Sequence, residues 1–238
     1  MREGGTPDPG LVIAVDGPSG SGKSTAARGA AVALGLRYLD TGAMYRAVTW
    51  WMLEHNIDLA DTDSVVKHGV ALRIDISTDP AQQFVLVDNV DVTTQIRSRR
   101  VSNAVSLVAA IPRIREFMRT MQRDIIGRAA AEAGGVVAEG RDVGTVVAPQ
   151  ATVKVFLTAS EQARAERRTA ELAAAVTAAS ITGSIDADLT RREQANRDRL
   201  DSPQTQQAAD AVEIDATELG QADVIAQIVD LARSRARA

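Results

Sequence analysis

The sequence predicts an α/β protein in which a parallel five-stranded sheet is flanked by helices. Two observations predict this class. Short runs of apolar, β-branched residues alternate along the chain with longer stretches that suit helices, as expected when helices connect parallel strands. The first run, residues 11–15, is followed by a glycine-rich loop and then by an Ala- and Leu-rich helical stretch, Lys23–Leu34, which Gly35 ends.

The glycine-rich loop satisfies the phosphate-binding P-loop motif, G-x-x-x-x-G-K-[ST]. The residues that meet it are Gly17-Pro18-Ser19-Gly20-Ser21-Gly22-Lys23-Ser24-Thr25. A surface loop could match by accident, but the strand before it and the helix after it are the context that the motif requires. We therefore expect a nucleotide here, with Lys23 reaching the β- and γ-phosphates and the Ser24 hydroxyl ligating Mg²⁺.

The composition excludes several classes of protein. Of the 238 residues, 45% are hydrophobic and 24% are charged, as is ordinary for a soluble globular protein. The formal net charge of −4 gives no reason to expect a nucleic-acid partner. The chain has no cysteine, which fits a cytoplasmic location, and no apolar run of the ~20 residues that a membrane span needs. Residues 1–9 are polar and rich in Gly and Pro, which predicts a disordered tail.

The first half of the chain predicts a core interrupted by a small insert. A strand over residues 37–40 leads into a helix that begins at Thr41, its expected cap, and ends near residue 56. Short alternating runs then predict a helix, a three-stranded antiparallel meander and a second helix, at residues 63–71, 72–76, 84–87, 90–92 and 102–110. The arginines at 97, 99 and 100 form a charge run that we expect to be solvated.

The second half returns to alternating strands and helices. Pro112 opens a long helix, because proline is favoured in the first turn. A capping box, Thr158-x-x-Glu161, opens another helix that carries Arg164, Arg167 and Arg168. The remaining expected segments are strands at 136–138, 152–157 and 211–215, a flexible connection at 173–185, and helices at 186–201 and 222–235.

Charged residues stand at the carboxyl ends of the expected strands. These residues are Asp16, Asp40 and the pair Arg141-Asp142. Ligands of open α/β sheets bind beyond this edge, so we expect the charged residues to form one rim of a binding site.

An arginine-rich helix suggests a lid over that rim. Arg192, Asn196 and Arg199 have the spacing i, i+4 and i+7, so they share one helix face. The stripe could simply face solvent. A phosphoryl-transfer enzyme, however, needs arginines at the transferred group and must exclude water, which is the purpose of a mobile lid.

Several blocks of the chain together resemble bacterial cytidylate kinases, over residues 11 to about 235. The blocks are the P-loop with Asp16 before it, Asp40-Thr41-Gly42-Ala43-Met44-Tyr45-Arg46, Ser106 with Ile111-Pro112-Arg113-Ile114-Arg115, residues 139–147 (E-G-R-D-V-G-T-V-V) and residues 154–157. The resemblance implies a P-loop NTPase fold and transfer of the γ-phosphoryl group of ATP to CMP or dCMP.

The resemblance also implies roles for individual residues. Residues 17–25 would hold the ATP phosphates, with Lys23 catalytic, while Asp16 and Ser24 would organise Mg²⁺. Arg46, Arg141 and Arg199 would grip the CMP phosphate, and Arg192 would join at the transferred group. Ser106, Arg115 and Asp142 resemble the residues that read cytosine, because a carboxylate and an arginine complement its amine donor and its acceptors. The remaining substrate-binding residues would be Asp40, Thr41, Tyr45 and Asn196.

One departure from the family lies in the lid helix. The family's helix reads R-D-x-x-D-x-x-R-x-x-S-P, and we align this pattern with residues 192–203. Asn196 then stands where the family has an aspartate that contacts the sugar. The alignment therefore predicts weaker dependence on sugar hydroxyls.

The resemblance divides the chain into parts and leaves alternatives open. The core would comprise residues 10–60, 111–160 and 202–238, with a monophosphate-binding insert at 61–110 and a lid at 161–201. We expect a monomer. Another nucleoside monophosphate kinase, of adenylate or uridylate type, or a P-loop switch protein that hydrolyses nucleotide slowly, would share many of these features.

Overall fold

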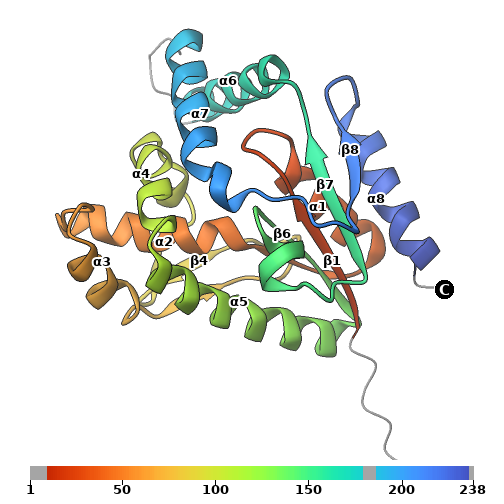
Figure 1. The fold of residues 1–238 in the computed structure, drawn as a ribbon, viewed down its shortest axis with the longest axis horizontal. Helices are drawn as coiled ribbons and strands as arrows, with labels where there is room; N and C mark the ends of the chain where they lie inside the picture. Colours follow the sequence, from red (N-terminus) through yellow and green to blue (C-terminus); the bar gives the residue numbers. More distant parts are fainter. Residues whose placement is uncertain (1–9, 179–185, 236–238) are drawn as a thin grey trace, which may run out of the picture.

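The structure is a computed structural model that describes residues 10–178 and 186–235. Within these residues the chain forms a main sheet of five parallel strands, in the order β2-β6-β1-β7-β8, and a small antiparallel sheet of three (Figure 1). The strands of the main sheet are β1 (Leu11–Asp16), β2 (Arg37–Asp40), β6 (Gly135–Gly140), β7 (Val153–Thr158) and β8 (Val212–Asp215). The expected parallel sheet is confirmed, whereas the tail at 1–9 lies outside the described residues.

Helices cover both faces of the main sheet. One face carries α1 (Lys23–Leu34) and α8 (Gln221–Arg235), and the other carries α2 (Thr41–Glu54) and α5 (Pro112–Ala133). Alternate residues of β1 point to opposite faces: Ile13 and Val15 pack in the apolar cluster with α1 and α8, and Ala14 packs in the cluster with α2 and α5. Burial on both faces explains why the strands read as continuous apolar runs.

The insert is confirmed as a small meander between helices. It comprises α3 (Thr62–Gly69), β3 (Ile74–Ile76), β4 (Val85–Val87), β5 (Val90–Asp91), the short 3₁₀ helix η1 (Gln95–Arg97) and α4 (Arg99–Ala109). Asp88 and Asn89 both have positive φ, at 49° and 67°, so the turn between β4 and β5 has the hairpin geometry that these residue types favour. α4 begins three residues earlier than the sequence predicts, because the Ser98 hydroxyl caps it by accepting from the Val101 N–H.

The cap of α2 differs from the expectation. The Asp40 carboxylate, rather than Thr41, accepts the N–H of Ala43 at 2.9 Å. Thr41 is instead the first helical residue, and its hydroxyl donates to the carbonyl oxygen of Glu139 at 2.7 Å. The contact ties the start of α2 to the end of β6.

Two further helices stand above the carboxyl edge of the main sheet. They are α6 (Glu161–Ala178) and α7 (Ala187–Asp201), which pack on each other at the top of Figure 1. The capping box at Thr158 is wrong, because Thr158 still pairs with Asp215 in the sheet and Ser160 accepts the Ala163 N–H instead. The flexible connection expected from residue 173 is also wrong up to Ala178, which remains helical; residues 179–185 lie outside the described part.

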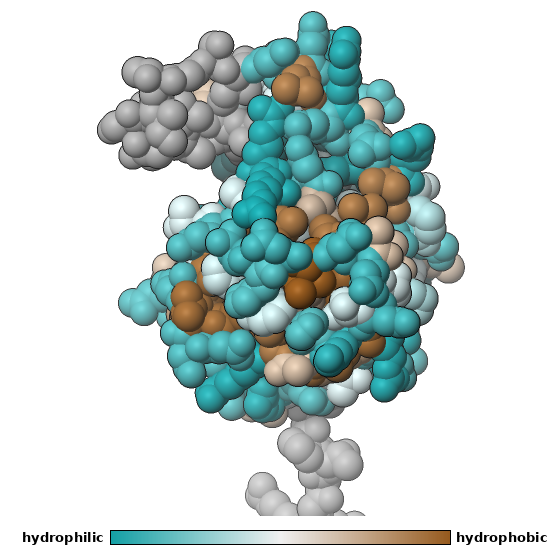
Figure 2. Space-filling model, turned by 90° about the vertical axis from the view of Figure 1, so that its left-hand side faces the viewer, coloured by the Kyte–Doolittle hydropathy of each residue, from teal (hydrophilic) through white to brown (hydrophobic). Residues whose placement is uncertain are grey.

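The surface is mainly hydrophilic on the side drawn in Figure 2. Among the described residues, the large apolar side chains that are exposed lie on separate elements, for example Val32 on α1, Phe84 before β4 and Leu107 on α4. No helix in the described residues is long and apolar enough to cross a membrane.

Candidate active site

The P-loop has the backbone conformation that its glycines permit. Gly17 has a φ of 145°, and a Cβ there would lie 2.1 Å from the carbonyl oxygen of Leu157, so only glycine lets the loop pass this close to β7. Gly22 has a φ of 97° and directly precedes α1. The loop therefore ends with the free N–H groups of a helix N-terminus, which attract phosphate.

Lys23 is folded back into the loop. Its ammonium group is buried and donates to the carbonyl oxygen of Pro18 at 2.7 Å. Burial, together with the nearby charge of Arg141, lowers the pKa of Lys23 to about 7. A phosphate bound in the loop would supply the counter-charge that restores the ammonium form.

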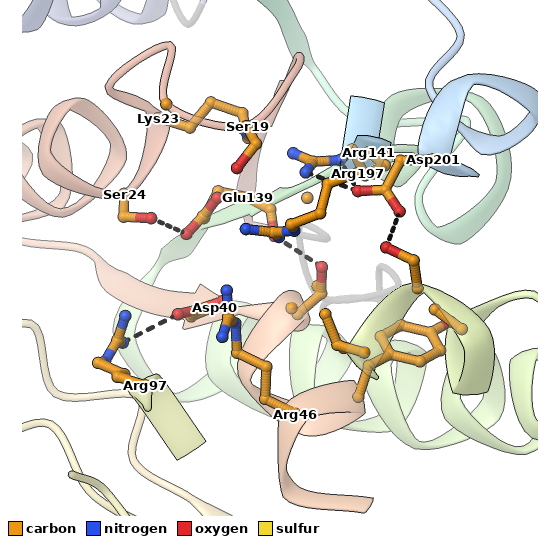
Figure 3. A pocket seen from close by; sticks show the side chains of 18 of the residues that line it. Ser19, Lys23, Ser24, Asp40, Arg46, Arg97, Glu139, Arg141, Arg197 and Asp201 are labelled. Carbon is orange, nitrogen blue, oxygen red and sulfur yellow. Dashed lines mark hydrogen bonds and ion pairs between the residues drawn. The ribbon is translucent and has the colours of Figure 1, made fainter. Parts of the chain in front are cut away.

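A cavity of about 590 Å³ joins the P-loop to the insert and to α7 (Figure 3). The lining residues that the sequence singled out are Ser19, Gly20, Gly22, Lys23, Ser24, Thr25, Asp40, Thr41, Tyr45, Arg46, Ser106, Arg115, Arg141 and Asp142. Residues from Ser19 to Gln204 thus meet at the carboxyl edge of the sheet, as the strand-end charges Asp40 and Arg141-Asp142 predicted.

Glu139 is a buried carboxylate that the sequence reasoning left out of the site. The Ser24 hydroxyl donates to Glu139 Oε1 at 2.5 Å, and the Tyr38 hydroxyl donates to the same oxygen at 3.2 Å. Burial raises the pKa of Glu139, and the charge of Asp40 acts in the same direction. Its position, the next-to-last residue of β6, could have revealed it, because the other strand-end carboxylates were selected on that ground.

Asp16 has a framework role in the structure. Its two carboxylate oxygens accept the backbone N–H groups of Val143 and Gly144 at 2.8 and 2.7 Å. These residues begin η2 (Val143–Val147), a π-helical turn directly after Arg141-Asp142. Burial raises the pKa of Asp16 to about 6, and the two backbone bonds oppose that rise. Asp16 is not among the residues that line the cavity.

The insert approaches the cavity through arginine contacts. Arg46 donates to the carbonyl oxygen of Ile96 at 3.1 Å and to the Ser102 hydroxyl at 2.9 Å. Arg97 is exposed, as expected, but it also lines the cavity and pairs with Asp40 at 3.1 Å, which the sequence did not predict.

The other two arginines of the charge run also have partners. Arg99 pairs with Glu193 of α7, and Arg100 pairs with Glu54 of α2. The run therefore joins the insert to its neighbours.

The three residues expected to read a base lie together in the cavity. The Arg115 guanidinium donates to Asp142 Oδ2 and lies 5.9 Å from the centre of the Tyr45 ring. Burial raises the pKa of Asp142, whereas the adjacent Arg115 opposes that rise. The Ser106 hydroxyl donates to Asp201 Oδ1 at 2.7 Å, so this serine also contacts the end of α7.

Arg141 joins the P-loop to α7. Its guanidinium donates to the carbonyl oxygen of Gly17 at 2.9 Å and to Asp201 Oδ2 at 2.9 Å. Arg141 and Arg197 extend from different elements toward the same part of the cavity (Figure 3).

The face of α7 that lines the cavity is not the face that the sequence predicted. Arg192, Asn196 and Arg199 are exposed, none of them lines the cavity, and Arg199 donates to the Asn196 side chain at 2.9 Å. The cavity instead meets Arg197 and Asp201. Among the described residues Arg197 Nε is buried without a hydrogen-bond partner, and burial lowers the pKa of Arg197 to about 10, with Arg141 acting in the same direction.

The rotation of α7 is fixed by contacts with the P-loop. Gln194 donates to the carbonyl oxygen of Ser19 at 3.0 Å, and Asp198 pairs with Arg164. These contacts turn the predicted stripe outward. Arg197-Asp198, Asp201 and Gln204 also have the spacing of R-D-x-x-D-x-x-R, with Gln204 in place of the second arginine, whereas Ser202-Pro203 match the end of the full pattern only in the register that starts at Arg192.

Two of the arginines of α6 contact the P-loop, and the third lines the cavity. Arg164 donates to the carbonyl oxygen of Ser19 at 3.1 Å, and Arg167 donates to that of Ser21 at 3.3 Å and to that of Ala216. Arg168 is the one of the three that lines the cavity.

A cavity that joins a P-loop to a second, arginine-lined half-site is typical of P-loop kinases, which move a phosphoryl group between two bound molecules. The family model described as "Cytidylate kinase" matches residues 13–234. The chain is 47% identical over 219 residues to the cytidylate kinase of Rhodococcus opacus, covering 92% of this chain and 93% of that protein. It is 43% identical over 225 residues to that of Streptomyces griseus, covering 94% of each. The chain belongs to the cytidylate kinase family.

Proposed function

We propose that this chain transfers the γ-phosphoryl group of ATP to CMP or dCMP, giving ADP and CDP or dCDP. The observation that carries the proposal is the shared cavity, which both the P-loop and the Arg115–Asp142 pair line. Family membership supports the same reaction.

The reaction exchanges one bond for another at phosphorus. A phosphate oxygen of CMP attacks the γ-phosphorus of ATP as the bond from that phosphorus to the bridging oxygen breaks. Negative charge spreads over the transferred group, so fixed cations stabilise the transition state. Lys23, Arg141 and Arg197 are the cations that we assign to this task, since all three are buried or half-buried and line the cavity. Arg46 of α2 and Arg97 of the insert also line the cavity and would hold the CMP phosphate.

Mg²⁺ fits the oxygen donors beside the P-loop. Ser24 and Glu139 offer a hydroxyl and a carboxylate 2.5 Å apart, and the described residues hold no cluster of three or more His, Cys, Asp or Glu that would suit a fully protein-ligated ion. Mg²⁺ commonly takes one or two protein oxygens and completes its shell with phosphates and water. We propose that Ser24 and Glu139 hold the ion and that Asp16 supports the adjoining backbone. When bound, Mg²⁺ would neutralise charge on the ATP phosphates.

Cytosine selection follows from the hydrogen bonds that Asp142 and Arg115 can offer. Cytosine presents an amine donor next to acceptors, which suits a carboxylate beside a guanidinium. Uracil presents an oxygen where cytosine has the amine, so it would face the Asp142 carboxylate without a donor. Ser106, which donates a hydrogen bond to Asp201, lines the same cavity as Arg115 and Asp142.

The surrounding parts take roles that follow from this chemistry. We propose that residues 61–110 form the monophosphate-binding insert and residues 161–201 the lid over a P-loop core. The substrates of the proposed reaction are soluble nucleotides, which supports a cytoplasmic location. The monomeric state is a prediction that light scattering on the purified protein would test.

Lys23→Ala tests the proposed reaction. Because Lys23 acts on charge that develops during transfer, its removal should lower kcat by roughly a hundredfold or more. Lys67→Ala, on the exposed side of α3, is the matched control and should retain the wild-type rate. The measurement is CDP formation from CMP and ATP, with circular dichroism to show that both variants are folded. A folded Lys23→Ala variant that turns over at the wild-type rate would refute the assignment.

A further inference from the structure

Helix α4 lines the cavity with Val105, Ser106 and Ala109, and two of its serines form hydrogen bonds with other residues that line it. Ser102 accepts a hydrogen bond from Arg46 at 2.9 Å, and Ser106, one turn further on, donates to Asp201 at 2.7 Å. The two serines thus link α4 to the proposed monophosphate site and to the end of α7.

A second pair on α4 faces the middle of α7. Arg99 Nε lies 2.9 Å from both carboxylate oxygens of Glu193, and Asn103 Nδ2 donates to Glu193 Oε1 at 2.8 Å. Arg99 and Asn103 are four residues apart, so they lie one above the other on α4 and enclose the carboxylate together. Burial alone would raise the pKa of Glu193, but the hydrogen bonds from Arg99 and Asn103 together with the charge of Arg99 outweigh it and lower that pKa.

Glu193 also stands one turn before Arg197 on α7. The next residue, Gln194, contacts the P-loop by donating a hydrogen bond to the carbonyl oxygen of Ser19. Asp198, further along α7, forms an ion pair with Arg164. Arg164 in turn donates to the same carbonyl oxygen of Ser19 at 3.1 Å. One helix therefore contacts α4 through Glu193, the P-loop through Gln194 and the cavity through Arg197.

We propose that Glu193 is a positioning residue, which holds α7 against α4 so that Arg197 is fixed over the P-loop when the monophosphate site is filled. The inference rests on the proposed kinase function. Glu193 lines a small space between α4 and α7 but not the cavity itself, so it acts through Arg197 and not on substrate. A loosened α7 would leave Arg197 poorly placed and would admit water to the γ-phosphate.

The test compares Glu193→Ala with the wild-type chain and with Glu166→Gln, a change at an exposed glutamate of α6. The assays measure kcat, KM for ATP, and the ratio of ADP released to CDP formed. Loss of Glu193 should lower kcat about fivefold or more and raise the ADP-to-CDP ratio, with KM for ATP nearly unchanged. Glu166→Gln should match the wild type.

A charge exchange separates positioning from simple loss of stability. Arg99→Glu combined with Glu193→Arg restores an ion pair across α4 and α7, and the Asn103 amide can present its oxygen to the new arginine. The double variant should recover most of the lost kcat and the wild-type ratio of ADP to CDP, whereas Arg99→Glu alone should behave like Glu193→Ala.

Two results would overturn the inference. One is a Glu193→Ala enzyme whose kcat and ADP-to-CDP ratio equal those of Glu166→Gln. The other is a charge exchange that recovers thermal stability but none of the lost kcat. Failure of the proposed function would look different, since the wild-type chain itself would then form no CDP.

Discussion

Gln204 takes the place of the second arginine when the pattern R-D-x-x-D-x-x-R is read from Arg197. It lines the cavity, and with its amide nitrogen turned toward α7 it donates to the carbonyl oxygens of Leu200 and Asp201 at 3.2 and 3.1 Å. An arginine here would add a fixed cation near Arg141 and Arg197. If the phosphate of CMP binds beside Arg141 and Arg197 as proposed, it would meet one cation fewer than the pattern provides.

Gln204→Arg should strengthen binding of the monophosphate. A hydrogen bond from a charged donor to phosphate contributes about 1.5–3 kcal/mol, so we expect KM for CMP to fall by roughly ten- to a hundredfold. Gln206→Arg is the matched control, because Gln206 is exposed and undergoes the same change of charge. A KM for CMP that is unchanged in Gln204→Arg, or that falls equally in both variants, would contradict this role.

Single residues were predictable where a motif fixes their chemistry. Lys23, Ser24, Arg115 and Asp142 all line the cavity, as their motifs indicated. The strand-end position of Glu139 marks it as a candidate, but its partner Ser24 depends on the pairing of β6 with β1, which is a long-range contact. Likewise, nothing local to Arg97 reveals its partner, since Asp40 is 57 residues away in sequence.

At the scale of single elements, α7 shows the limit of periodicity. Spacing of i, i+4 and i+7 establishes that Arg192, Asn196 and Arg199 share a face, and their exposure together agrees with that. Periodicity alone leaves open which face is turned to the site, because a polar helix has no apolar stripe to orient it. Contacts between α7 and the P-loop decide the question.

The orientation of α7 predicts opposite outcomes for two arginines on one helix. Arg197→Ala should lower kcat by roughly ten- to a hundredfold, because it removes a half-buried cation whose Nε has no partner among the described residues. Arg192→Ala should leave kcat near the wild-type value, since Arg192 is exposed. Steady-state kinetics with CMP and ATP distinguish the two, and a larger loss in Arg192→Ala would mean that the helix turns its other face to the substrates.

At the scale of the whole molecule, the arrangement of elements follows from the alternation of buried strands and helices. Parallel neighbours require crossover connections, and the helices that provide them cover both faces of the main sheet. The meander was predictable for the same reason, because its alternating runs and its Asp-Asn turn break the pattern of buried strands. The order of strands was not, since it depends on contacts between distant segments.

In the proposed function, the whole cavity serves phosphoryl transfer between ATP and a cytidine monophosphate. The most direct test measures kcat/KM of the purified chain with ATP and Mg²⁺ for CMP, dCMP, UMP and AMP. We expect the values for CMP and dCMP to exceed those for UMP and AMP by about tenfold or more, because Asp142 and Arg115 complement cytosine alone. Equal or faster phosphorylation of AMP or UMP would indicate another nucleoside monophosphate kinase, and ATP hydrolysis that no monophosphate accelerates would indicate a switch protein; either result would contradict the account.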